Sequence, residues 1–213
     1  YFTRLSRQLV QALSETTADG FVFRVDLRLR PFGDAGPLAL PADALEHYYQ
    51  THGRDWERYA WIKARPVAGD AGLGQSIIDK LRPFVYRRYL DFTALDALRE
   101  IKAMIDSEVQ RKGNRQHIKL GPGGIREIEF IVQSLQLIRG GQVAALRRRD
   151  TPATLQLLAQ LGLLADAEVA ALQAAYRFLR DLEHRLQLVE DAQTHSLPVQ
   201  PDECARIAFA MGF

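Results

Sequence analysis

One short segment combines a carboxylate with several arginines at a spacing that suits phosphate chemistry. From Phe21 to Arg30, apolar residues alternate with mostly charged ones, which is the period of a β-strand with one buried face. The charged face carries Arg24, Asp26, Arg28 and Arg30. A guanidinium group can bind two phosphate oxygens at once, through two of its N–H groups. A lone carboxylate suits a Mg²⁺ ion that also binds phosphates. The pattern indicates phosphoryl or nucleotidyl transfer, although a mixed-charge surface strand would look the same.

Asp26 cannot complete a two-metal site by itself. The sequence contains no Asp-x-Asp pair and no Gly-Ser pair followed by spaced aspartates. If Asp26 binds a metal, we expect its partner carboxylates upstream of Tyr1. The chain also starts without methionine, inside an amphipathic pattern, so we interpret it as an internal piece of a longer protein.

A second group of charges lies between aromatic residues over the expected helix 55–64. Arg54 and Arg58 are four residues apart, an unfavourable like-charge spacing, so helix stability does not explain these charges. A solvated helix is one interpretation, and a helix facing phosphate is the other. For the second, Lys63 and Arg65 are the candidate phosphate or nucleotide ligands.

A glycine-rich loop, Gly121–Gly124, precedes a helix expected over 124–139. Free N–H groups at such a helix start favour anions, but the loop lacks the full P-loop signature, and a tight interdomain turn is equally compatible. Arg126, Glu127 and Glu129 lie in a strongly apolar helix and need partners. Arg126 could pair with Glu129 or reach a neighbouring domain, so we assign these three residues to domain coupling.

The remaining chain predicts a mainly α fold. Helices are expected over residues 2–14, 42–52, 55–64, 75–90, 94–112, 124–139, 152–161 and 166–190. The last one carries an apolar stripe that we interpret as bundle core. The small-residue segment 68–72 is the candidate domain boundary, which divides the chain into 1–69 and 70–213.

Composition excludes several classes of protein. Apolar residues make up 47% and charged residues 25%, the balance of a soluble globular protein. A net charge of +2 gives no argument for nucleic acid or a membrane surface. The single cysteine, Cys204, rules out an internal disulfide, and the five histidines show no metal-binding spacing. We interpret the run Arg147–Arg149 as solvated surface.

Three motifs, in order along the chain, resemble the glutamine synthetase adenylyltransferase family. The first is Val25–Gly33 with Gly36-Pro37, the second is Gly53–Tyr59 leading into Ile62–Arg65, and the third is Lys119–Gln133. The first two are more similar to the N-terminal, adenylyl-removing half of that family than to its other half.

The resemblance implies an incomplete polymerase-β-like nucleotidyltransferase α/β domain over residues 1–69, followed by a helical bundle over 70–213. It also implies that phosphate removes AMP from adenylylated glutamine synthetase and releases ADP, while the parent enzyme adenylylates the same target with ATP. Asp26 matches the third catalytic carboxylate and would hold Mg²⁺. The implied partners are glutamine synthetase and a PII-type regulatory protein, in the cytoplasm, with no nucleic acid or membrane. Without the early carboxylates, the isolated chain is expected to be inactive.

Two alternatives remain open. The chain could be a non-catalytic helical docking module for glutamine synthetase or a PII-type regulator. It could also belong to a related uridylyltransferase-type sensor, although the Lys119–Gln133 match favours the glutamine synthetase enzyme.

Overall fold

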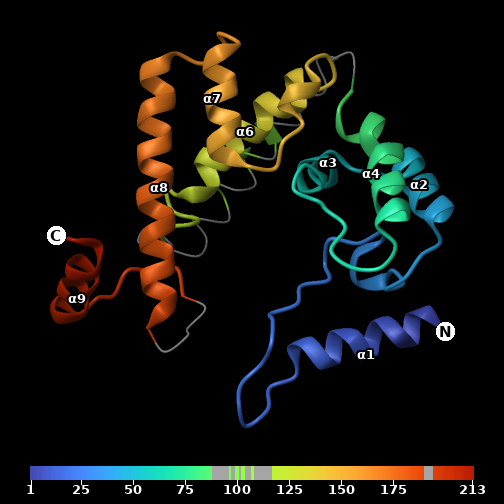
Figure 1. The fold of residues 1–213 in the computed structure, drawn as a ribbon, viewed down its shortest axis with the longest axis horizontal. Coiled ribbons are helices and arrows are strands. Elements are labelled where there is room, and N and C mark those ends of the chain that lie inside the picture. Colours follow the sequence, from blue (N-terminus) through green and yellow to red (C-terminus); the bar gives the residue numbers. More distant parts are fainter. Residues whose placement is uncertain (88–95, 97–98, 101, 104–106, 108–116, 190–193) are drawn as a thin grey trace. The chain divides into compact units, whose positions relative to one another are not determined.

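The computed structural model describes residues 1–87, 96, 99–100, 102–103, 107, 117–189 and 194–213. These residues are mainly helical and divide into two compact units, Tyr1–Val85 and Tyr86–Phe213 (Figure 1). Residues 70–85, which the sequence assigned to the bundle, pack within the first unit. The functional assignment of the two domains stays a prediction. None of the described helices is long and apolar enough to cross a lipid bilayer.

The first unit contains four helices, which confirm the predicted positions to within a few residues. They are α1 (Phe2–Ser14), α2 (Ala42–Thr51), α3 (Asp55–Trp61) and α4 (Ala71–Val85). A short 3-10 turn, η1 (Gly33–Ala35), lies in the loop before α2. The core joins Tyr48 and Tyr49 of α2 to Leu81 of α4. It is sealed by aromatic contacts, with the rings of Tyr49 and Trp61 5.3 Å apart and nearly perpendicular. This core fixes α2, α3 and α4 as one packed group.

The prediction of a strand over Phe21–Leu29 was wrong, because no strand forms there. The segment is extended, but no strand ladder forms, and its apolar side chains, including Phe23, remain largely exposed. Its main chain is bonded to another main-chain group at one place, where Phe23 N–H donates to Leu13 O at 2.8 Å. A strand needs a neighbour to accept and donate ladder hydrogen bonds, and the described residues contain only two isolated bridges. The alternating pattern therefore has no sheet to join within these residues.

The second unit is a helical bundle. The helices described in full are α6 (Ile125–Arg139), α7 (Thr151–Gln160), α8 (Asp166–Leu188) and α9 (Pro201–Met211), with the 3-10 turn η2 (Ala144–Leu146) before α7. α7 packs along α8, and α9 lies beside the C-terminal end of α8 (Figure 1). The helix expected over 94–112 lies mostly outside the described residues.

Two apolar clusters hold this bundle together. One cluster joins α6, η2, α7 and α8 through Val132, Leu146, Leu155, Leu158 and Val169. The other joins α8 and α9 to the segment just before the glycine-rich loop, through Ile118, Leu182, Leu186 and Ile207. Members of the α8 stripe belong to both clusters, which confirms that the stripe is bundle core.

Candidate functional site

Asp26 and Arg28 form a direct pair on one side of the extended segment. Arg28 Nε lies 3.1 and 3.0 Å from the two carboxylate oxygens, and Nη2 lies 2.6 Å from Oδ2. The Arg28 main-chain N–H also donates to Oδ1 at 2.9 Å. Residues two apart in an extended chain share a side, so the period of two that predicted a strand also explains this pair.

Hydrogen bonds from Arg28, first from its side chain and then from its main chain, lower the pKa of Asp26 to about 2. The carboxylate is therefore ionised throughout the neutral range. The Asp26 and Arg28 side chains are 49% and 76% exposed, so solvent and ligands can reach both. Arg24 lies exposed on the same segment and lowers the pKa of Asp26 further through its charge. The pair offers a negative oxygen acceptor beside cationic donors, which suits binding of a metal–phosphate group.

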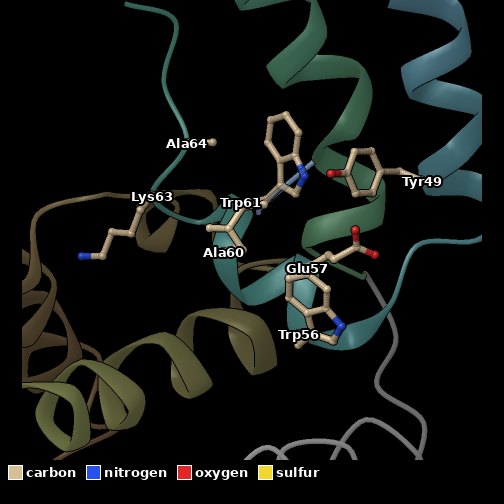
Figure 2. Close-up of a pocket in the computed structure, with 8 residues that line it drawn as sticks. Tyr49, Trp56, Glu57, Ala60, Trp61, Lys63 and Ala64 are labelled. Atoms are coloured by element: carbon tan, nitrogen blue, oxygen red, sulfur yellow. The ribbon is translucent and has the colours of Figure 1, made fainter. Parts of the chain in front are cut away.

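Lys63 lines a cavity of about 360 Å³ in the first unit, while Arg65 is exposed beyond the end of α3. The cavity is lined mainly by apolar and aromatic side chains from the extended segment, α2, α3 and the residues just after α3: Leu29, Tyr49, Trp56, Glu57, Ala60, Trp61, Lys63 and Ala64. Figure 2 shows the rings of Tyr49, Trp56 and Trp61 around this space, while the Lys63 amine points away from them. Leu29 alternates with Arg28 and Arg30 along the extended segment. The cavity therefore meets the apolar side of that segment.

Two charged residues of α3 that were not candidate ligands from the sequence are buried. Glu57 is 3% exposed and accepts hydrogen bonds from the Tyr48 hydroxyl at 3.1 Å and from Arg54 N–H at 2.8 Å. The second contact caps the helix start, and the Glu three residues after the N-cap position was the sequence signal for it. Glu57 therefore joins α2 to α3.

Arg58 has a comparable structural role at the other side of α3. Its Nε donates to Phe84 O at 3.0 Å, and its Nη2 donates to Val85 O at 3.1 Å, at the end of α4. Its Nη1 pairs with Asp55 at 3.0 Å. The expectation that helix stability does not explain these charges was wrong. It rested on Arg54 and Arg58, four residues apart, whereas the stabilising pair is Asp55 with Arg58, three residues apart. Arg58 satisfies carbonyls that a helix end leaves open.

The three residues assigned to domain coupling have separate surroundings. Glu127 accepts from Lys102 Nζ at 2.5 Å and from Gly123 N–H at 2.8 Å, and Glu129 accepts from the Tyr176 hydroxyl at 3.1 Å. The Arg126 side chain is exposed, and the suggested Arg126–Glu129 pair is not among the contacts of the described residues, in which Glu129 is bonded to Tyr176. These contacts tie the glycine-rich loop and α6 to the rest of the second unit, and a role between domains stays a prediction.

A charged cluster around Glu183 also escaped the sequence analysis. This carboxylate is 3% exposed and lies 2.5 Å from Arg180 Nη1, 3.5 Å from Lys119 Nζ and 3.7 Å from His195 Nδ1. The His195 ring meets the ring of His117 edge-on at 5.4 Å. Burial, followed by the nearby charge of His195, lowers the pKa of His117. The residues come from distant parts of the sequence, so no local spacing signals the cluster.

The interpretation of Arg147 as solvated surface was also wrong. Its guanidinium donates to Gly140 O at 2.6 Å and to Gly141 O at 3.2 Å, just after α6. It also lies 5.6 Å from the centre of the Tyr86 ring. Arg148 and Arg149 are exposed, as expected for the rest of the run. Arg147 therefore stabilises the end of a helix rather than facing solvent.

Asp26 is the residue that could contribute to a Mg²⁺ site. Mg²⁺ commonly takes one or two protein carboxylates together with phosphate oxygens and water. Across the described ranges, no group of three histidine, cysteine, aspartate or glutamate side chains could hold a metal ion. Asp26 therefore fits the role of a single protein ligand to Mg²⁺, and the described residues do not form a complete protein metal site.

Comparison with known proteins agrees with the motifs. Residues 1–80 match the family model for glutamate-ammonia ligase adenylyltransferase, and residues 99–213 match that for GlnD PII-uridylyltransferase. Over its whole length the chain is 60% identical to a bifunctional glutamine synthetase adenylyltransferase/adenylyl-removing enzyme of Xanthomonas campestris pv. campestris (strain B100). The enzymes of the same name from Xanthomonas axonopodis pv. citri (strain 306) and Hahella chejuensis are 59% and 57% identical over the same span.

The chain spans 23%, 23% and 22% of the length of these three relatives. The alignment with each relative covers the whole chain and therefore both compact units. The chain belongs to the family of bifunctional glutamine synthetase adenylyltransferase/adenylyl-removing enzymes.

Proposed function

We propose that this chain forms part of the nucleotidyltransferase that removes AMP from adenylylated glutamine synthetase. It would lie in the N-terminal half of the complete protein. The observation that carries the proposal is the exposed, ionised Asp26 held by Arg28. It lies within the first family motif, in a segment whose relatives are named as bifunctional glutamine synthetase adenylyltransferase/adenylyl-removing enzymes. The complete protein would also adenylylate glutamine synthetase with ATP and so regulate nitrogen assimilation.

The reaction proposed is phosphorolysis. A phosphate oxygen forms a bond to the phosphorus of the AMP group, and the bond from that phosphorus to the tyrosine oxygen breaks. The products are ADP and a tyrosine whose oxygen takes up a proton. Mg²⁺, when bound, would neutralise phosphate charge and orient the reacting oxygens. Asp26 would supply one oxygen ligand to it, and Arg24, Arg28, Lys63 and Arg65 would neutralise phosphate charge.

The extended segment supports an incomplete polymerase-β-like domain in the first unit. Residues 21–29 keep the alternation of a strand while exposing Phe21, Phe23 and Leu29. Exposing large apolar side chains to water costs about 25 cal/mol per Å² of apolar surface. Additional strands, from the part of the relatives' length that this chain does not span, would cover that face and pair the main chain. They would also bring the missing carboxylates to Asp26.

A second candidate function rests on the second unit. Residues 99–213 match the family model whose description is GlnD PII-uridylyltransferase. This bundle would therefore dock a PII-type regulatory protein or glutamine synthetase. This role is compatible with catalysis in the first unit and requires none of its charged residues. A cytoplasmic location of the complete protein stays part of this proposal and follows from the family resemblance.

The proposal is tested by assaying the complete protein for phosphate-dependent ADP release from adenylylated glutamine synthetase in Mg²⁺. Asp26→Asn keeps the size of the side chain and removes its charge, so we expect ADP release to fall by at least roughly 100-fold with binding of glutamine synthetase retained. The matched control is Asp19→Asn, an exposed carboxylate in the turn before the extended segment. Full activity of Asp26→Asn would show that this chain acts in binding and not in catalysis.

A further inference from the structure

Arg30 was expected to bind phosphate, yet its guanidinium is directed into its own loop. Nη1 donates to Leu27 O at 2.6 Å, Nη2 to Asp34 O at 3.1 Å and Nε to Gly36 O at 3.2 Å. Its side chain is only 19% exposed. All three nitrogens therefore already donate to main-chain carbonyls on both sides of the turn.

The loop that Arg30 clamps is constrained at its other end as well. Phe32 has a left-handed backbone with φ of 61°, which is rare for a bulky residue and persists only where the surroundings enforce it. Its ring contacts Tyr48 edge-on at 4.7 Å, so α2 helps to hold this conformation. Gly36 closes the turn, since a Cβ there would lie 1.8 Å from Pro31 O. The loop therefore has one backbone path between the extended segment and α2.

Leu27 directly follows Asp26 in the chain. Fixing the Leu27 carbonyl fixes the peptide plane that joins Leu27 to Arg28, the residue that holds the Asp26 carboxylate. A lysine could not reproduce this clamp, because a single ammonium lacks the planar fork that reaches three carbonyls at once. Arg30 is thus bonded to the main chain that connects Asp26 to Arg28.

We propose that Arg30 is a positioning residue, which fixes the Asp26–Arg28 pair through the loop 31–36, and not a ligand of phosphate. The inference rests on the proposed function of Asp26 and assigns a different role to its neighbour. A phosphate ligand contributes binding through its charge and needs free N–H groups aimed at solvent. A positioning residue contributes through geometry, so conserving its charge does not conserve its effect.

The test compares Arg30→Lys and Arg30→Gln in the complete protein, with amide hydrogen exchange over residues 26–36 as the first measurement. The amides of Arg28, Gly33 and Gly36 donate hydrogen bonds within this stretch, so their exchange reports on its structure. We expect both variants to exchange roughly tenfold faster there, with no change in α2, α3 or α4. Arg24→Gln is the matched control for this measurement and leaves the exchange unchanged, because Arg24 is exposed and takes no part in the clamp.

Kinetics with phosphate provide the second measurement. We expect kcat for ADP release to fall by roughly 10–100-fold in both variants, while KM for phosphate stays within about twofold. Unchanged exchange, with a raised KM for phosphate that lysine restores, would overturn the proposal and make Arg30 a phosphate ligand. Faster exchange throughout the first unit would also overturn it, as a general loss of structure. If the unaltered protein releases no ADP, the proposed function fails, and hydrogen exchange still decides whether Arg30 holds the loop.

Discussion

The hydroxyl of Tyr48 donates a hydrogen bond to Glu57 Oε1 across 3.1 Å, and so joins the middle of α2 to the first turn of α3. Both residues are buried, and the ring of Tyr48 also supports the strained Phe32. This one contact therefore connects the helical core of the first unit to the loop that follows Asp26.

The Tyr48–Glu57 contact predicts coupled losses of stability. Glu57→Ala leaves the Tyr48 hydroxyl and the Arg54 N–H without their acceptor, so we expect the free energy of unfolding to fall by about 2–4 kcal/mol. Tyr48→Phe removes one donor and should cost about 0.5–1.5 kcal/mol. Urea unfolding can be followed by tryptophan fluorescence, since Trp56 and Trp61 lie in α3. The double variant measures the coupling between the two residues. If its loss of unfolding free energy equals the sum of the two single losses, the Tyr48–Glu57 contact contributes nothing to stability.

Arg58 provides a prediction about the junction of α3 and α4. Arg58→Met leaves the Phe84 and Val85 carbonyls without their donor, and we expect a loss of about 2–4 kcal/mol in the same unfolding measurement. Arg58→Lys retains the charge but not the fork, and should recover only part of that loss. Arg82→Gln, at an exposed position on α4, is the control and should change stability by less than about 0.5 kcal/mol. A loss for Arg58→Met as small as the control's would contradict this role.

The stability of the second unit should depend on acid through Glu127. A hydrogen bond from Lys102, followed by one from Gly123 N–H, lowers the pKa of Glu127 below its ordinary value. A lowered folded pKa adds stability that is fully present above the ordinary glutamate pKa and is lost as the pH falls through the folded pKa. Acid unfolding of the wild type and Glu127→Gln would measure this term. The variant should lose less stability over that acid range, and parallel curves would contradict the prediction.

Gly36 should tolerate no side chain. A Cβ at this position would lie 1.8 Å from Pro31 O, so Gly36→Ala must move the loop backbone. We expect faster amide exchange over residues 26–36 and a stability loss of about 1–3 kcal/mol. Gly72→Ala, in the first turn of α4, is the comparison, because its Cβ would meet only the Asp70 side chain, at 3.2 Å. Similar behaviour of the two variants would show that the close approach at Gly36 is unimportant.

The helices could be predicted because their apolar period is local to each segment. Helix α8, for example, carries its stripe within its own sequence, and the stripe meets both apolar clusters of the second unit. The strand over Phe21–Leu29 failed for the opposite reason. Its pattern specifies an extended segment, but pairing depends on a partner that the described residues do not supply.

The candidate site was predictable to the same extent. The pairing of Asp26 with Arg28 follows from their spacing of two along an extended chain. The role of Arg30 does not follow, because residue type alone cannot distinguish a guanidinium facing phosphate from one facing carbonyls that the turn brings together. The burial of Glu57 and Arg58 depends likewise on contacts with α2 and α4, which have no local signal.

The most direct test of the account is to follow the phosphorus of isotopically labelled phosphate in the complete protein, with adenylylated glutamine synthetase as substrate. Phosphorolysis places the label in the β-phosphate of ADP, whereas hydrolysis gives unlabelled AMP. We predict labelled ADP from the wild type and at least roughly 100-fold less from Asp26→Asn, which keeps the fold and removes the charge held by Arg28. Equal labelling of ADP by both proteins would contradict a catalytic role for Asp26, and unlabelled AMP from the wild type would contradict phosphorolysis.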